Sequence, residues 1–101
     1  MTTSQTPNKY HILQYKYVPD ILEKRGPYRE EHLGFANAML EAGKLVMAGA
    51  VGDPVDGAVF IFRNSSIEEI KAFVKADPYV VNDLVPSHTI GPYNVAVGNT
   101  I

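Results

Sequence analysis

The chain contains no cysteine and no tryptophan, and it has no long apolar run. The missing cysteine excludes disulfide bonds, thiolate nucleophiles, iron–sulfur clusters and zinc sites built on thiolates. The longest apolar stretch, Leu45 to Val51, is far shorter than the ~18 residues that a membrane-spanning helix needs. Because the N-terminus also lacks the apolar core of a secretory signal, we expect a cytoplasmic protein with no membrane partner.

Neither sign of charge dominates, since 9 Lys and Arg stand against 11 Asp and Glu for a formal net charge of −2. The sequence pI is about 5.8, and no run of basic residues offers the positive surface that nucleic acid or anionic lipid requires. Small molecules and protein partners remain as expected binding classes. At 101 residues the chain can build one modest core, so we expect a single domain at 9–95 between flexible tails at 1–8 and 96–101.

The pattern of apolar residues predicts an α+β fold. Strands are expected at 10–18, 44–50, 58–63 and 88–95, and helices at 30–42 and 67–76, followed by a short helix after Asp77. Leu33, Ala36 and Leu40 form the predicted apolar face of the first helix, and the second is expected to bury four residues: Ile67, Ile70, Phe73 and Val74. The order βαββαβ is typical of the ferredoxin-like fold, an antiparallel sheet with helices on one face.

The strands are apolar on both sides, which bears on assembly. In the first strand Tyr10 and Ile12 alternate onto one face and Leu13 and Tyr15 onto the other, and the segment 58–62 is apolar throughout. Two helices cover only one side of such a sheet, and a solvated side normally carries polar residues. We therefore expect a homodimer in which a second copy covers the free face. A monomer with an apolar face is the alternative.

Three histidines are the natural candidates for general acid/base chemistry. His11 is expected to be buried at an interface and His88 to be solvated. His32 shares a helical stripe with Arg29 and Ala36, so its side chain can face a cleft between helix and sheet. On spacing alone, the plainer interpretation of His32 as a partly exposed histidine without a catalytic task is favoured.

Asp77 is the carboxylate best placed to assist a histidine, because it lies in the segment that returns beside the first helix. A carboxylate fixes the tautomer of a catalytic imidazole and stabilises its protonated form. However, Asp77 followed by Pro78 is also a good helix cap, and spacing does not separate the two roles. The histidines and carboxylates show no metal-ligand spacing, so we expect no metal site.

Several motifs occur in order along nearly the whole chain. They are R-x3-R-x2-H-L from Arg25 to Leu33, Gly43-Lys44-Leu45 leading to Ala48-Gly49, Asp77-Pro78-Tyr79-Val80, and Ile90-Gly91-Pro92-Tyr93. In this combination the sequence resembles the YCII-related (YciI-like) family. The resemblance implies a ferredoxin-like fold that dimerises through the sheet as a dimeric α+β barrel. It also implies an active site formed by His32 and Asp77 without a cofactor, and a branch of the family similar to lyases that eliminate chloride from chlorinated hydroxyquinol-like rings.

With that resemblance we expect lyase-like or isomerase-like chemistry, in which Asp77 orients His32 and His32 removes a proton from a small cyclic acid. Arg29, together with Arg25 and Tyr79 of the same motifs, is expected to bind the substrate, since an arginine stays charged at any relevant pH. An ion pair of Arg29 with a neighbouring carboxylate is its plainer role. The competing hypothesis is a module without catalysis, which binds a small ligand or serves for dimerisation.

The sequence departs from the family pattern at two places beside the predicted site. Glu30-Glu31 replaces the more usual Pro-Ala before His32, and Ala50 replaces the common Pro after Ala48-Gly49. These changes bear on the choice of substrate more than on the fold.

Overall fold

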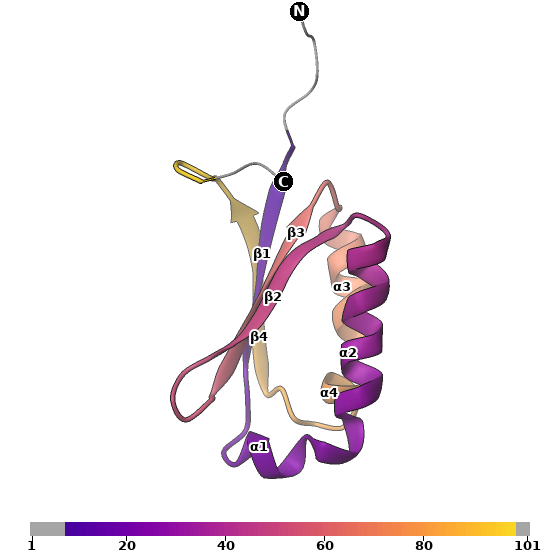
Figure 1. Cartoon of the computed structure of the whole chain (residues 1–101), viewed down its shortest axis with the longest axis vertical. Coiled ribbons are helices and arrows are strands. Elements are labelled where there is room, and N and C mark those ends of the chain that lie inside the picture. The colour runs from indigo at the N-terminus through magenta and orange to yellow at the C-terminus, as the bar shows by residue number, and fades with distance from the viewer. Residues whose placement is uncertain (1–7, 99–101) are drawn as a thin grey trace, which may run out of the picture.

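The computed structural model of the chain describes residues 8–98. The elements follow the order β1 (Tyr10–Lys16), α1 (Ile21–Lys24), α2 (Gly26–Glu41), β2 (Leu45–Val51), β3 (Gly57–Arg63), α3 (Ile67–Ala76), α4 (Pro78–Val81) and β4 (Ser87–Tyr93). The four strands pair antiparallel in the order β2-β3-β1-β4. Helices α2, α3 and α4 all lie on one side of the sheet (Figure 1). The α+β ferredoxin-like class is therefore confirmed, and the predicted tails lie mostly outside the described residues.

Helix α2 begins at Gly26, so the predicted start at Glu30 is wrong by about one turn. Pro27 explains the difference, because proline fits the first turn of a helix, where its missing N–H would have no partner. The sequence pair Gly26-Pro27 looks like a break, whereas in the structure it opens the helix. As a result Arg29 lies one turn before His32 inside the same helix, and Arg25 stands at the helix N-cap.

The core lies between the sheet and the helices. Leu13 and Tyr15 of β1, which the sequence places on one face, are buried on the helix side together with Phe60 and Phe62 of β3. Helix α3 begins with the predicted capping box, in which Ser66 and Glu69 exchange hydrogen bonds, and it buries three residues against this layer: Ile70, Phe73 and Val74.

Two parts of the predicted core are wrong. Ile67 is 39% exposed, because it is the first residue of α3, at the solvent-exposed capped end. Leu33 and Leu40 of α2 are also exposed, whereas Ala36 is buried. Since α2 turns His32 and Ala36 toward the sheet, the two leucines lie at the rim of the helix–sheet contact, over the edge strand β2.

The other face of the sheet has no helix on it among residues 8–98 (Figure 1). Ile12 and Ile61 are half-buried there, in the centre of the sheet. Met47 and Val51 on β2 and Tyr93 on β4 are largely exposed toward the two edges. Within the described part of the chain, no helix has the length and apolarity needed to cross a bilayer.

Candidate active site

His32 and Asp77 come together in the interior of the fold. His32 projects from the second turn of α2 and is 6% exposed, and Asp77, between α3 and α4, is fully buried. Nδ1 of His32 lies 2.8 Å from Oδ1 of Asp77, which is hydrogen-bond distance. The interpretation of His32 as a partly exposed helix histidine is therefore wrong, because α2 turns the face that carries His32 and Ala36 toward the sheet.

Asp77 also caps α4, so its two alternative roles are not exclusive. Oδ1 accepts a hydrogen bond from the backbone N–H of Tyr79 at 3.0 Å, as expected of an N-cap residue. The second oxygen, Oδ2, accepts a hydrogen bond from the hydroxyl of Tyr15 on β1 at 2.7 Å. Three donors from three different elements therefore converge on one buried carboxylate.

The imidazole of His32 is held in one orientation. With the carboxylate of Asp77 as acceptor, Nδ1 is the nitrogen that donates, and this leaves Nε2 with a free lone pair. Tyr79 stacks on the imidazole with ring centroids 3.8 Å apart and planes 6° apart, and Phe60 meets it edge-on at 6.2 Å. Nε2 has no hydrogen-bond partner among the described residues, so it is free to accept a proton.

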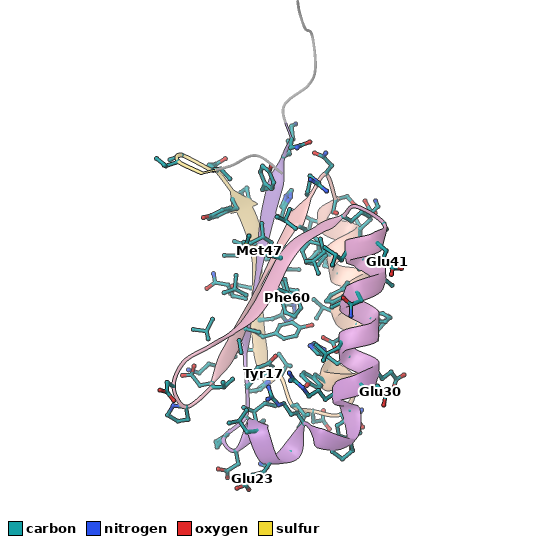
Figure 2. All side chains as sticks on the ribbon, viewed as in Figure 1. Tyr17, Glu23, Glu30, Glu41, Met47 and Phe60 are labelled. Carbon is teal, nitrogen blue, oxygen red and sulfur yellow. The ribbon has the colours of Figure 1, made fainter. Side chains whose placement is uncertain are left out.

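A cavity of about 200 Å³ opens beside His32, between α2 and the β2–β3 part of the sheet. Figure 2 shows two of its aromatic residues, Tyr17 and Phe60, between the sheet and α2, whereas Glu30 and Glu41 project outward from the helix. The lining combines aromatic, cationic and small residues: Tyr17, Arg25, Arg29, His32, Leu33, Ala36, Ala48, Gly49, Ala50, Ala58, Phe60 and Tyr79. No carboxylate lines it, so the cavity is suited to an anion.

The structure thus brings together all five predicted site residues, with Arg25, Arg29 and Tyr79 lining the cavity and His32 bonded to Asp77. The ion pair proposed as the plainer role of Arg29 is absent among residues 8–98. Ala50, where the sequence departs from the family pattern, forms part of the cavity wall, whereas the Glu30-Glu31 pair does not.

The remaining histidines lie elsewhere. His88 is exposed, as expected, and lies on the edge strand β4. His11 is only half-buried, with no hydrogen-bond partner for Nδ1 among the described residues, so the expectation of a buried histidine was only partly met. No group of three or more potential metal-ligating side chains occurs within residues 8–98.

Sequence reasoning missed three aromatic residues of the site, Tyr15, Tyr17 and Phe60. Tyr15 on β1 and Tyr17 just after its end alternate onto one side of the chain, which was the available signal. Burial raises the pKa of Tyr15 far above its ordinary value, and the charge of Asp77 raises it further. Burial raises the pKa of Tyr17 as well, and the charges of Tyr79 and Asp77 act in the same direction. Both phenols therefore stay protonated in the folded protein.

These two phenols make the fold sensitive to alkali. In the unfolded chain they lose their protons near pH ~10, but in the folded protein only at higher pH, so above pH ~10 the unfolded state binds fewer protons. The contribution of these two phenols to the free energy of unfolding should therefore be constant below pH ~10. It should then fall by about 1.4 kcal/mol per pH unit for each phenol.

Denaturant titrations between about pH 8 and pH 11 measure this effect. Tyr17→Phe is the matched variant, because it removes one of the two phenols and keeps the ring. It should show about half of the tyrosine-dependent fall. If the free energy of unfolding fell equally steeply with pH in both proteins, the phenol of Tyr17 would not contribute to the alkaline loss of stability.

Known proteins share the fold of this chain. In structure, the chain is similar to the 5-chloro-2-hydroxyhydroquinone dehydrochlorinase TftG from Burkholderia phenoliruptrix, solved in complex with 2,5-dihydroxybenzoquinone. The TM-score is 0.71 and the sequence identity 19%, over 84% of this chain and 93% of that one. A NIPSNAP family protein from Agrobacterium tumefaciens superposes with a TM-score of 0.60 at 12% identity, over 92% and 90% of the two chains. These similarities show the fold.

No curated protein sequence matches the chain. The model of the YCII-related domain, in contrast, matches residues 9–94, close to the predicted domain at 9–95 and including all five predicted site residues. The chain therefore belongs to the family of YCII-related domains.

Proposed function

We propose that this protein is a small enzyme that uses the His32–Asp77 pair, and no cofactor, for acid/base chemistry of the lyase or isomerase type. The observation that carries the proposal is the 2.8 Å contact between a buried carboxylate and an imidazole that borders a cavity. Asp77 accepts a hydrogen bond from Nδ1–H, so Nε2 is the basic atom and the carboxylate stabilises the imidazolium that forms.

In the proposed reaction Nε2 of His32 takes a proton from carbon or oxygen of a small cyclic acid. The electron pair left behind then either expels a leaving group from a neighbouring carbon or moves a double bond. In the first case the leaving group departs as an anion with its bonding electron pair, and the imidazolium releases its proton to solvent. In the second case the imidazolium returns its proton at the new position, and neither case involves an oxidant or a reductant. Asp77 holds the imidazole throughout by its hydrogen bond to Nδ1, while the backbone N–H of Tyr79 holds the carboxylate in place.

Arg25 and Arg29 would hold the anionic part of the substrate. Both border the cavity, and no carboxylate lines it or pairs with them among the described residues. A guanidinium stabilises an oxyanion that develops as the proton leaves, and this effect is large where water is excluded.

The size of the cavity and one structural neighbour favour a ring-shaped substrate. A volume of about 200 Å³ exceeds the ~150 Å³ of an engineered cavity that accepts benzene, so a six-membered ring with a few substituents fits. Aromatic rings of Tyr17, Phe60 and Tyr79 line the walls. TftG, which has the same fold, is a dehydrochlorinase solved with a dihydroxybenzoquinone. We therefore propose hydroxylated six-membered rings as the first substrates to test.

Exchange of carbon-bound hydrogen with deuterium tests the proposal without knowledge of the complete reaction. Hydroxybenzoquinones and cyclic 1,3-diketones would be incubated with the protein in deuterated buffer and followed by NMR. We expect protein-dependent exchange or loss of a substituent for at least one of them. Binding at His32 in a soaked crystal without any turnover of the bound compounds would instead favour the module without catalysis.

The two arginines give a second test, with a charge-matched control. Arg25→Gln and Arg29→Gln should each weaken binding of an anionic ring by about 10-fold or more, the value of one or two charged hydrogen bonds. Lys24→Gln removes the same charge from a neighbouring exposed residue outside the cavity and should leave binding nearly unchanged. Equal losses in all three variants would mean that net charge, rather than contact, governs affinity.

We also propose that the protein is a homodimer through the uncovered face of the sheet. This face carries Ile12 and Ile61 in its centre and exposed Met47 and Val51 toward one edge, and a copy of itself is the self-complementary partner for such a surface. Gel filtration of the 11.1 kDa chain at micromolar concentration should give about twice the monomer mass.

Met47→Asp should shift the protein to a monomer, because a charge on the covered face would be buried without a partner. Leu22→Asp is the control, since Leu22 is 50% exposed and lies on the short helix α1, outside the sheet. A stable monomer for the unchanged protein would disprove the dimer and leave an apolar free face.

A further inference from the structure

The hydroxyl of Tyr15, one of the three hydrogen-bond donors to Asp77, has no role in the proposed reaction. The backbone N–H of Tyr79 satisfies the helix cap and His32 supplies the base, but the hydroxyl of Tyr15 also reaches Oδ2, at 2.7 Å, from the opposite side of the core. Tyr15 is 62 positions away in the chain and does not line the cavity. Neither capping nor substrate contact therefore explains this hydrogen bond.

Tyr15 is held firmly in place. Its strand, β1, lies in the interior of the sheet between β3 and β4, and its ring packs edge-on against Phe60 at 4.9 Å and Tyr17 at 6.1 Å. The strand β3 also approaches its backbone closely, since a Cβ on Gly57 would lie 2.6 Å from the carbonyl oxygen of Tyr15. The phenol therefore has a fixed position.

The proton of this phenol is fixed as well. Burial and the nearby charge of Asp77 raise the pKa of Tyr15, so the hydroxyl keeps its proton and remains a donor. The only acceptor within its reach among the described residues is Oδ2 of Asp77. Since Oδ1 alone receives both His32 and the N–H of Tyr79, the bond at Oδ2 is the contact that fixes the plane of the carboxylate.

We propose that Tyr15 is a positioning residue, which holds the carboxylate of Asp77 so that Oδ1 faces Nδ1 of His32 and Nε2 stays the proton acceptor toward the cavity. The proposal deepens the proposed function and rests on it in one respect, namely that His32 is the base. Tyr15 on β1 thereby sets the tautomer of His32 on α2 through the carboxylate of Asp77, which lies at the start of α4.

The tautomer of His32 is the direct readout, and it needs no substrate. In ¹⁵N-labelled protein without ligand, the two ring nitrogens have distinct chemical shifts according to which one carries the proton. We expect the Nδ1–H form to dominate in the unchanged protein. In Tyr15→Phe the ratio of the Nδ1–H to the Nε2–H form should fall by about fivefold, which corresponds to the ~1 kcal/mol net value of one hydrogen bond.

Tyr17→Phe is the matched control for this experiment. Tyr17 lies two residues further along the chain, just after β1, and is also buried, but its hydroxyl makes no hydrogen bond to Asp77 among the described residues. The two variants therefore remove the same atom from similar surroundings. Loss of packing alone would move the melting temperature of both proteins but the tautomer of neither.

A second substitution covers the case in which Tyr15→Phe does not fold. Incorporation of 3-fluorotyrosine at position 15 keeps ring and hydroxyl and makes the phenol a stronger donor, so the Nδ1 shift of His32 should change, whereas 3-fluorotyrosine at position 17 should leave it unchanged. An unchanged tautomer ratio in a folded Tyr15→Phe protein, or an unchanged Nδ1 shift with 3-fluorotyrosine at position 15, would overturn the proposal.

The outcome is separable from that of the proposed function. If the tautomer responds to Tyr15 but removal of His32 leaves the hydrogen exchange of substrates intact, the positioning holds and the catalytic role of His32 fails. If removal of His32 stops hydrogen exchange while the tautomer ratio of His32 is unchanged in Tyr15→Phe, the positioning role of Tyr15 is wrong and the catalytic role of His32 stands.

Discussion

His32→Asn should lower the rate of substrate conversion by about 10² to 10⁴, the contribution of a well-placed general base. The amide nitrogen of asparagine can take the place of Nδ1 and still donate to Oδ1 of Asp77, whereas nothing replaces Nε2. Turnover, or the exchange of substrate hydrogen with deuterium, measures the effect. Because the donor to Asp77 is kept, the melting temperature should change much less than in His32→Ala.

His88→Asn controls for the loss of any histidine from the protein. His88 is exposed on β4 and does not border the cavity, so this variant should keep full activity. A folded His32→Asn protein with undiminished turnover would rule out His32 as the base. The alternative of a ligand-binding module without catalysis would then be the better description of the cavity.

Asp77→Ala should be the most destabilising single substitution at the site. It removes the acceptor of three buried donors, from Tyr15, His32 and the backbone of Tyr79, and each unsatisfied donor costs about 1–3 kcal/mol. With the cavity and the lost helix cap, we expect a decrease of at least about 3–5 kcal/mol in the free energy of unfolding. Domains of this size are stable by only about 5–15 kcal/mol, so the variant should be close to unfolding at room temperature.

Ser66→Ala measures the stability that a helix cap contributes by itself, without the hydrogen bonds that Asp77 receives from Tyr15 and His32. Ser66 caps α3 in the same way that Asp77 caps α4, but it is exposed and makes no other side-chain contact of this kind. Its loss should cost about 1 kcal/mol, as is usual for an N-cap. Urea denaturation of both variants gives the comparison. If Asp77→Ala cost no more than Ser66→Ala, the hydrogen bonds from Tyr15 and His32 would contribute nothing net to stability.

The local elements followed from the sequence because their causes are local. The capping box of Ser66 and Glu69 starts α3 where expected, and the Asp77-Pro78 pair starts α4. Alternation along β1 placed Leu13 and Tyr15 on one face, and the structure shows that this face meets the helices. The start of α2 was missed because Gly26-Pro27 is ambiguous in isolation: the same pair can end one element or open the next.

The candidate site was predicted from the sequence only in part. Family motifs named His32 and Asp77, but periodicity alone favoured an idle and partly exposed histidine, because it could not show which way α2 turns against the sheet. Tyr15 carried no motif that separates it from an ordinary strand tyrosine. Its role depends on the distance from a hydroxyl on β1 to a carboxylate 62 residues later.

The sequence by itself determined the α+β class and the order of the elements, since periodicity and caps are properties of neighbouring residues. The family motifs in addition named His32 and Asp77, the pair for which acid/base chemistry is proposed. The tertiary structure alone decided that His32 is buried, that Arg25 and Arg29 border one cavity, and that three donors meet at Asp77. Those features arise where a strand, a helix and a helix junction pack together. Contacts between such distant segments depend on packing geometry, which no local pattern encodes.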